Sequence, residues 1–432
     1  MIKIIPAALF FLSFFASLVS NAILRQISIK YNFLIDAPND QRKFHHKKTP
    51  ATGGIAISIG IIFSGLFLFA FTDSDYDLDI STEKFINSNQ TEENSSTNSY
   101  SFELENGIEV KIQRFDDQSF TITLPDGEKR LYRVYVDQNS LKNDSYMVLE
   151  EGSENQIRIT NFSLGLFLFT LLVQFVMVLD DLWGLRALTK LFLQSVCVGG
   201  LIFVSDMYIN NLGNLFGFGD INLGLFGIPF TIFCVVGIMN AFNMIDGLNG
   251  ICASLALIPL MYVTFLGKFS YGLLVPIGAI IGFLAYNLGF LGKKRGVFLG
   301  DSGSNMLGFA VAFICIEYSQ NVNHPSYINP VTALWLVAIP LIDCVAVMIS
   351  RALNGIMPFR SGRDHLHHKL LDLGFKPKKI LIIFIATSAL LALVGFAIEI
   401  NFQNKEYISF FAFAALAFFY YLISKKSIQK NV

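Results

Sequence analysis

This chain has few cysteines and few charged residues for its length of 432 residues. All five cysteines fall within apolar runs and lack the spacing of a metal site, so we expect neither disulfides nor a cysteine-bound metal. Charged residues make up only 15% of the chain, and the net charge of −1 says nothing about partners because the two signs are segregated along it. We predict no nucleic-acid partner. The cysteines are Cys197, Cys234, Cys252, Cys315 and Cys344.

Hydrophobic residues, in contrast, make up 53% of the chain, and the mean hydropathy is +0.53. Such a composition is typical of a polytopic membrane protein with one small soluble domain. Eleven apolar runs are long enough to cross about 30 Å of hydrocarbon. The predicted fold class is therefore all-α, with about eleven transmembrane helices. The runs lie near 4–24, 53–71, 162–179, 191–205, 222–240, 251–266, 272–291, 303–319, 331–350, 379–398 and 407–424.

The first run has an alternative interpretation as a signal peptide, because residues 15–22 include small side chains. Cleavage there would leave the next basic segment outside, so we favour an uncleaved helix. With eleven spans the connecting segments alternate sides, and one alternating set carries 21 of the 32 basic residues against only three in the opposite short segments. Positive charge favours the cytoplasm, which predicts the N-terminus outside and the C-terminus inside.

Residues 72–160 interrupt this pattern and divide the chain into three parts, 1–71, 72–160 and 161–432. The insertion begins with a polar linker rich in Ser, Asn and Thr and carries 19 acidic against 8 basic residues. Short alternating segments follow at 101–105, 108–115, 119–124 and 131–136, separated by turn signals. They predict a small β-rich extracytoplasmic insertion. A solvated spacer and a docking or receptor role at the outer face are both open.

Five polar clusters all fall on the predicted cytoplasmic side. The first, 36–50, holds four cations and two histidines within residues 42–48, Lys48 among them, and precedes Gly53-Gly54. It predicts a site for a diphosphate or an anionic lipid head group, with an ordinary positive-inside anchor as the alternative.

The second cluster is Asp180-Asp181, which ends an apolar run and is followed by Arg186 and Lys190. If both face one cleft, the repulsion between the two carboxylates raises the pKa of one of them, which suits that carboxylate to accept a proton. A helix end whose carboxylates are paired with Arg186 or Lys190 is the alternative.

The third cluster runs from Asn240 to Gly250 between two long apolar runs and places three amides, a carboxylate and two turn-forming glycines where a helix leaves the bilayer. Amide and carboxylate oxygens suit Mg²⁺ or the polar edge of a nucleotide. The fourth, Gly300-Asp301-Ser-Gly-Ser304, offers backbone N–H groups, hydroxyls and a carboxylate at a helix start, as phosphate and Mg²⁺ together require. A capping turn and a helix N-cap are the respective alternatives.

The fifth cluster, 360–369, has three histidines in four residues beside two arginines. No nearby cysteine or glutamate completes a zinc site, and an anion cradle fits better. Carboxylates for a metal beside cations for phosphates indicate Mg²⁺-assisted phosphoryl transfer on an anionic substrate. A transporter or flippase for an anionic solute or a lipid-linked sugar is the main alternative. Such a protein is expected to carry charged residues within its spans, and here these are scarce, with Asp343 the clearest example.

These residues resemble a known family, the polyprenyl-phosphate N-acetylhexosamine-1-phosphate transferases of glycosyltransferase family 4. The resemblance covers nearly the whole chain except 72–160, and its last motif resembles the branch that uses simple UDP-N-acetylhexosamines. Phospho-N-acetylmuramoyl-pentapeptide transferase, a related enzyme, has adjacent histidines there instead. The matching motifs are Asp180-Asp181, Asn240-x-x-Asn243-x-x-Asp246-Gly, Gly300-Asp301-Ser-Gly-Ser and His365-Leu-His367-His368.

The resemblance implies transfer of a sugar-1-phosphate, GlcNAc-1-phosphate above all, from a UDP-sugar to undecaprenyl phosphate in the bacterial inner membrane, with release of UMP. It implies Mg²⁺ as cofactor, with Mn²⁺ as an alternative, and it leaves a homodimer open. Asp301 and Asn243 would hold the metal, and Asp180 or Asp181 would deprotonate the lipid phosphate or form a covalent intermediate. The implied substrate-binding residues are Lys48, Asn240, Asp246, Asn249, Arg363, His365, His367 and His368.

Two positions depart from the family's pattern. The family commonly has Asp where Asn249 stands, which alters the expected uracil contact, although Asn still offers an acceptor and adds donors. The family's aspartate before the first histidine is replaced by Gly362, and Asp364 stands on the other side of Arg363. The sequence therefore does not predict which sugar this loop selects.

Overall fold

The structure, a computed structural model, forms two separate units, one of 3–70 and 159–432 and another of 71–158. It describes residues 5–36, 48–71, 99–103, 109–114, 119–123, 129–135, 147–150, 161–266, 271–292, 295–320, 328–357, 362–402 and 405–428. The basic stretch 37–47 of the first cluster lies outside these residues, as do Lys293, Lys294 and Arg360.

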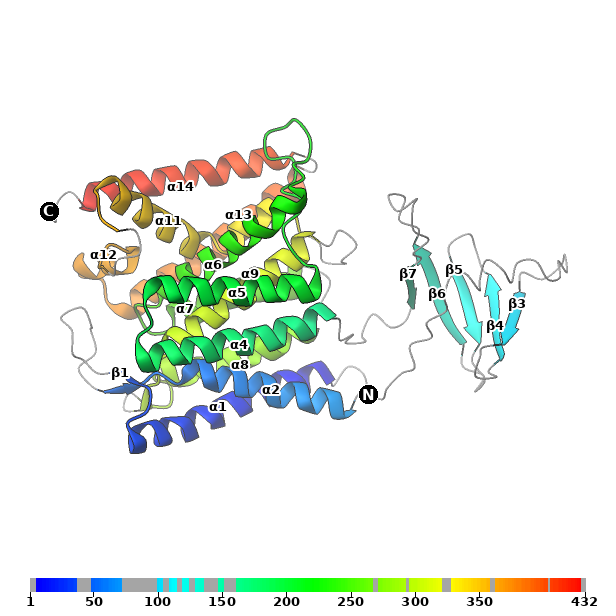
Figure 1. Ribbon diagram of the computed structural model, residues 1–432, viewed down its shortest axis with the longest axis horizontal. Helices are drawn as coiled ribbons and strands as arrows, with labels where there is room; N and C mark the ends of the chain where they lie inside the picture. Colours follow the sequence, from blue (N-terminus) through cyan, green and yellow to red (C-terminus); the bar gives the residue numbers. More distant parts are fainter. Residues whose placement is uncertain are drawn as a thin grey trace. The chain divides into compact units, whose positions relative to one another are not determined.

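The first unit is a helical bundle in which each of the eleven apolar runs is helical (Figure 1). Its helices are α1 (Ile5–Tyr31), α2 (Gly53–Phe71), α4 (Asn161–Trp183), α5 (Ala187–Ser205), α6 (Gly227–Ile245), α7 (Ile251–Leu266), α8 (Leu274–Asn287), α9 (Gly300–Gln320), α10 (Pro330–Leu336), α11 (Ala338–Leu353), α12 (Leu366–Asp372), α13 (Pro377–Asn401) and α14 (Glu406–Ile428).

Six of these helices are long and apolar enough to cross a membrane, or seven if α10 and α11 are one bent span. The chain is therefore a polytopic membrane protein by helix length and composition, while the count of eleven spans stays a prediction. The apolar parts of α2, α7 and α8 are shorter, and α9 opens with the polar run from Gly300 to Asn305. The six are Ala7–Tyr31, Phe162–Trp183, Ala187–Ser205, Gly224–Ile245, Pro377–Asn401 and Glu406–Ser424.

The run 331–350, expected to be one helix, is two helices that meet at Val337 with a bend of 83°. Pro340 explains the break, because proline has no N–H to donate to the carbonyl of Leu336 and its ring would collide with that carbonyl. The candidate span at 331–350 is therefore bent, and whether it crosses the membrane as one span stays a prediction.

Helix α9 lies at the centre of the bundle and packs against α4, α6, α7 and α10. Its side chains are buried almost throughout, with Phe309 and Phe313 completely inaccessible. Close approach to α6 depends on Gly308, where an added Cβ would lie 2.8 Å from the Cα of Met239. This packing holds the start of α9 beside the ends of α4 and α6.

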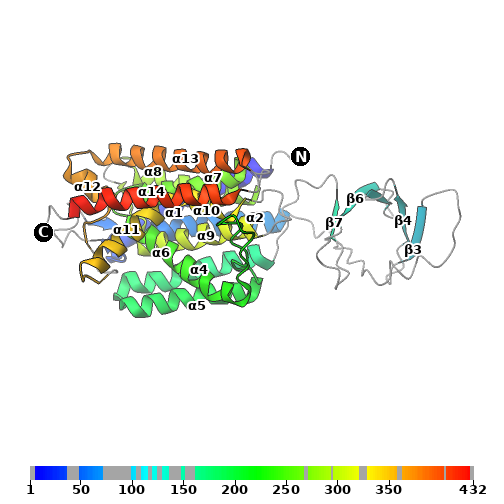
Figure 2. The same cartoon turned by 90° about the horizontal axis from the view of Figure 1, so that it is seen from above.

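All the described polar clusters lie at one end of the bundle. The C-terminal end of α14 and the short helix α12 share that end, while α1 begins at the other (Figures 1 and 2). A two-stranded sheet of β1 (Ile35–Asp36) and β2 (Thr49–Pro50) joins it, and Pro50 accepts a hydrogen bond from Phe298 N–H at 2.8 Å. Strand β2, just before α2, is thereby tied to the loop that leads into Asp301.

The second unit contains five strands that form an antiparallel sheet in chain order. Four strands overlap the expected segments, and the fifth, β7, was not predicted. The location of this second unit outside the cell stays a prediction. The strands are β3 (Ser99–Glu103), β4 (Glu109–Arg114), β5 (Ser119–Thr123), β6 (Lys129–Tyr135) and β7 (Met147–Glu150).

Candidate active site

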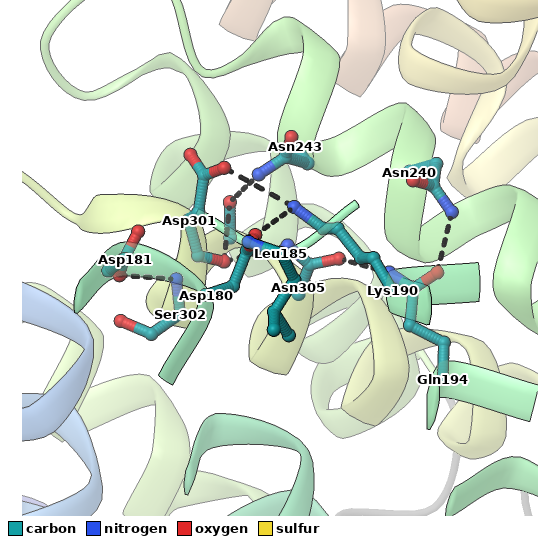
Figure 3. Close-up of polar contacts among 11 residues, drawn as sticks. Asp180, Asp181, Leu185, Lys190, Gln194, Asn240, Asn243, Asp301, Ser302 and Asn305 are labelled. Carbon is teal, nitrogen blue, oxygen red and sulfur yellow. Dashed lines mark hydrogen bonds and ion pairs between the residues drawn. The ribbon is translucent and has the colours of Figure 1, made fainter. Parts of the chain in front are cut away.

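Three carboxylates from two helices lie close together, and two of them bind the same lysine (Figure 3). Asp180 and Asp181 end α4, and Asp301 lies in the first turn of α9. The ammonium of Lys190, from the first turns of α5, lies 2.9 Å from Asp180 Oδ2 and 3.3 Å from Asp301 Oδ2. The pairing of Asp180 with Lys190, which was the alternative interpretation of this cluster, is thus present, but the same lysine also contacts Asp301.

Asp181 is held differently from its neighbour. Its Oδ2 accepts the backbone N–H of Ser302 at 3.1 Å, so the start of α9 binds this carboxylate as a helix N-terminus binds an anion. Gly300, at φ +81°, makes the approach possible, because a Cβ there would lie 2.9 Å from the Ala51 carbonyl oxygen and 3.4 Å from Asp181 Oδ2. Among the described residues, Asp181 has no cation as a partner.

A chain of side-chain amides leads to the start of α9, where Asn305 donates to the backbone carbonyl of Asp301. Asn240 donates to Gln194 Oε1 at 3.0 Å, and Gln194 donates to Asn305 Oδ1 at 2.7 Å (Figure 3). Asn243 donates to Ser304 Oγ at 3.0 Å, which leaves its amide oxygen available. The sequence reasoning missed Gln194, although a lone amide inside an apolar run is a signal. Asn240 is joined to this chain of amides, and a direct contact with substrate stays a prediction.

The donor set fits Mg²⁺ held jointly with a phosphorylated substrate. No group of three or more His, Cys, Asp or Glu within the described part of the chain is arranged to hold a metal alone. Mg²⁺ typically takes one or two protein carboxylates and fills its other positions with waters and substrate phosphates. Asp301, whose side chain is 52% exposed, and the oxygen of Asn243 offer that partial set.

The turn after α6 connects the carboxylates to the histidine segment. Asp246 is half-buried. Its pKa is raised to about 8, mainly by burial and to a lesser extent by the negative charge of Asp301. The next residue, Gly247, faces His367, since a Cβ on Gly247 would lie 2.1 Å from His367 Nε2. Asn249 is exposed and donates to the carbonyl of Asn287 at 3.0 Å, so part of its amide is used to hold the end of α8.

The histidine segment is built around a buried aspartate. His365 Nδ1 lies 2.8 Å from Asp343 Oδ2, and the N–H of Leu366 donates to Asp343 Oδ1 at 3.0 Å. His367 is 1% exposed, and neither of its ring nitrogens has a hydrogen-bond partner among the described residues. Buried polar groups are normally hydrogen-bonded, which makes the two nitrogens of His367 candidates for contact with a polar group of a substrate.

Arginines flank this segment. Arg363 pairs with Asp372 at 2.9 Å, and the buried Arg351 pairs with Asp364 at 2.9 Å. This second pair explains the departure at Gly362, because a Cβ there would lie 2.7 Å from Arg351 Nη2 and 2.9 Å from Asp364 Oδ2. The absence of a side chain at Gly362 thus leaves room for the pair of Arg351 and Asp364.

Lys48 is exposed and directly precedes β2, which is tied to the segment before Asp301. Its side chain has no hydrogen bond or ion pair with another described residue. The structure therefore brings Asp180, Asp181 and Asp301 together and sets Gly247, beside Asp246, against His367. Contact of Lys48 with a nucleotide stays a prediction.

The two neighbouring histidines resist protonation. Burial, followed by the charge of His368, lowers the pKa of His367 to about 3, and burial followed by Arg363 lowers that of His368 to about 4. The unfolded chain binds a proton near the ordinary pKa of 6.5, so the folding stability held by a neutral His367 is present above pH 6.5 and is lost as pH falls toward 3.

We therefore expect wild-type protein to lose about 2 kcal/mol of stability from His367 alone between pH 7 and pH 5. His367→Gln should remove this share, so that its midpoint of thermal unfolding falls less steeply over the same pH range. Parallel pH profiles for wild type and variant would contradict a neutral buried His367.

Comparison with known proteins agrees with the family that the sequence motifs resemble. The family model for glycosyl transferase family 4 matches residues 163–319, from the start of α4 to the end of α9. The chain is 37% identical over 254 residues to undecaprenyl-phosphate alpha-N-acetylglucosaminyl 1-phosphate transferase of Escherichia coli K12, covering 57% of this chain and 68% of the relative. Proteins of the same name from Yersinia pestis, at 37% identity over 55% of this chain and 66% of the relative, and from Haemophilus influenzae, at 35% over 59% and 73%, are also similar.

Proposed function

Because the chain belongs to glycosyl transferase family 4, we propose that it transfers GlcNAc-1-phosphate from UDP-GlcNAc to undecaprenyl phosphate and releases UMP. The observation that carries the proposal is the bridge that Lys190 makes between Asp180 and Asp301, with Asp181 held at the start of α9. It is joined by the buried His367, whose two ring nitrogens have no hydrogen-bond partner among the described residues. The cluster offers charge for a metal and a proton, and the histidine offers hydrogen bonds for a substrate. The names of its relatives support both the acceptor and the sugar.

In this reaction an oxygen of the lipid phosphate attacks the sugar-bearing phosphorus of UDP-GlcNAc, and the P–O bond to UMP breaks. Bound Mg²⁺ would neutralise charge that develops on the phosphate oxygens. Asp301 and the Asn243 oxygen would hold that ion. Lys190 lies where it can move from the carboxylates to a substrate phosphate.

Asp181 is the better proton acceptor of the aspartate pair. Asp180 Oδ2 binds the ammonium of Lys190 and its Oδ1 accepts the N–H of Leu185, so both of its oxygens are already engaged. Asp181 faces backbone N–H and has no such cation among the described residues. We assign to Asp181 the removal of a proton from the lipid phosphate, and to Asp180 the placement of Lys190.

For the substrate, Asp246, Asn249 and Lys48 are proposed to lie near the nucleotide. Arg363 with His365, His367 and His368 is proposed to lie near the sugar and diphosphate. The protein would act in the bacterial inner membrane, with this end of the bundle facing the cytoplasm. A transporter is not favoured, because the charged side chains that the structure brings together lie at one end of the helices.

The direct test is UMP release by purified protein in detergent with Mg²⁺, undecaprenyl phosphate and a panel of UDP-sugars. Release with UDP-GlcNAc, and its loss without lipid phosphate, is the expected result. Folded protein that releases no UMP from any UDP-sugar would reject the proposal. Replacement of Mg²⁺ by Mn²⁺, or its removal by chelation, tests the metal separately.

The unit of 71–158 is expected to be dispensable for turnover, because it forms a separate unit and is predicted to lie on the other side of the membrane. Deleting 75–158 and joining the ends with a short linker should leave UMP release within about twofold of wild type. Loss of activity in a deletion variant with wild-type melting behaviour would contradict the predicted topology.

A further inference from the structure

We propose that Asp343 is a positioning residue that fixes the ring of His365 and, through it, the histidine segment of the active site; this proposal rests on the proposed function. Asp343 was the clearest charged residue within an apolar run, and no role in the reaction accounts for it. It lies on α11, and its side chain is only 2% exposed. An isolated carboxylate is costly at such a position, so its partners should explain its presence.

Those partners come from two elements, the start of α12 and α14. Asp343 Oδ1 accepts hydrogen bonds from the N–H of Leu366, at the start of α12, and from the hydroxyl of Tyr420 on α14. Asp343 Oδ2 faces His365 Nδ1 at 2.8 Å. A carboxylate that accepts at both oxygens is in its acceptor-only form, and therefore His365 Nδ1 carries the hydrogen.

This arrangement determines which nitrogen of His365 is available to bind the substrate. With Nδ1 bound to Asp343, Nε2 is the remaining nitrogen, and it has no other partner among the described residues. The ring planes of His365 and His367 lie within 7° of parallel, with their centroids 6.0 Å apart. Holding His365 therefore also limits where His367 can lie against Gly247.

Replacing Asp343 by asparagine gives a sharp test because it conserves shape. The side-chain oxygen would remain with its two donors, Leu366 N–H and the Tyr420 hydroxyl. The new NH₂ group would then face His365 Nδ1, which can accept from it only without a proton. The variant should thus shift the hydrogen of His365 from Nδ1 to Nε2 while the fold is retained.

We expect Asp343→Asn to lower kcat/KM for UDP-GlcNAc by about 10- to 100-fold, the range typical of residues that orient a functional histidine. Tyr420→Phe removes one of the two bonds to Oδ1 and should cost less than Asp343→Asn. Asp220→Asn serves as the matched control, because Asp220 lies in the loop between α5 and α6, at the end of the bundle away from the site.

A double-variant cycle separates positioning from simple stabilisation of the fold. In a His365→Gln background, Asp343→Asn should cause little further loss of kcat/KM, since the ring that it orients is absent. An equal loss in both backgrounds would overturn the proposal, as would wild-type kcat/KM in the Asp343→Asn single variant.

The decisive measurement is the ¹⁵N spectrum of histidine-labelled protein in lipid, with His365 assigned from His365→Gln. We expect hydrogen on Nδ1 in the wild type and on Nε2 in Asp343→Asn. Hydrogen on Nε2 in the wild type would overturn the proposal. If the wild type released no UMP, the proposed function would fail, and this spectrum would still decide the role of Asp343.

Discussion

Replacing Asp301 by asparagine should reduce UMP release by at least about 100-fold, equivalent to about 2.7 kcal/mol of transition-state stabilisation. The change keeps the shape of the side chain and removes one negative charge from the group of carboxylates around Lys190. Because Asp301 is half exposed, its neutralisation should leave the fold intact. Steady-state kinetics at saturating Mg²⁺, with melting curves for both proteins, measure the effect.

Asp220→Asn is the control for this variant as well. Asp220 is an exposed carboxylate that accepts a hydrogen bond from Asn211 at 3.2 Å, far along the helices from Asp301. It should retain wild-type turnover. If Asp301→Asn kept more than a tenth of the wild-type rate, the proposed role of Asp301 in holding Mg²⁺ would be wrong.

Local sequence pattern predicted the helices well, because each apolar run must satisfy its own backbone hydrogen bonds in a membrane. Alternation of the runs then placed the motifs at one end of the bundle, where the structure brings them together. The bend at Val337 was missed, although Pro340 offered a local signal for it. Strands β1 and β2, of two residues each, were too short to leave a pattern.

The contacts inside the site were less predictable, since they join residues far apart in the chain. Lys190 and Asp301 are 111 positions apart, and they meet because α5 packs on α4 and α6, which both pack on α9. The same holds for Asp343 with His365, whose contact depends on how the chain returns after α11. The glycine at position 362 likewise has an explanation only in the folded protein, where a side chain there would collide with the pair of Arg351 and Asp364.

Replacing Gly247 by alanine should lower kcat/KM by about 10- to 100-fold by displacing His367. The φ of Gly247 lies outside the left-handed region, so its backbone tolerates alanine. The new methyl group would nevertheless lie 2.1 Å from His367 Nε2. The ring has little room to yield, because His368 lies against it with a centroid distance of 4.1 Å.

Gly237→Ala, on the helix α6 that precedes this turn, is the matched control, since a Cβ at Gly237 meets no heavy atom within 4 Å among the described residues. It should keep full activity and gain up to about 1 kcal/mol of helix stability. In a His367→Ala background, Gly247→Ala should cause no further loss, because the colliding ring is gone. Wild-type kcat/KM in Gly247→Ala itself would show that His367 has no fixed position against the turn, and would remove the link between the histidines and the carboxylates.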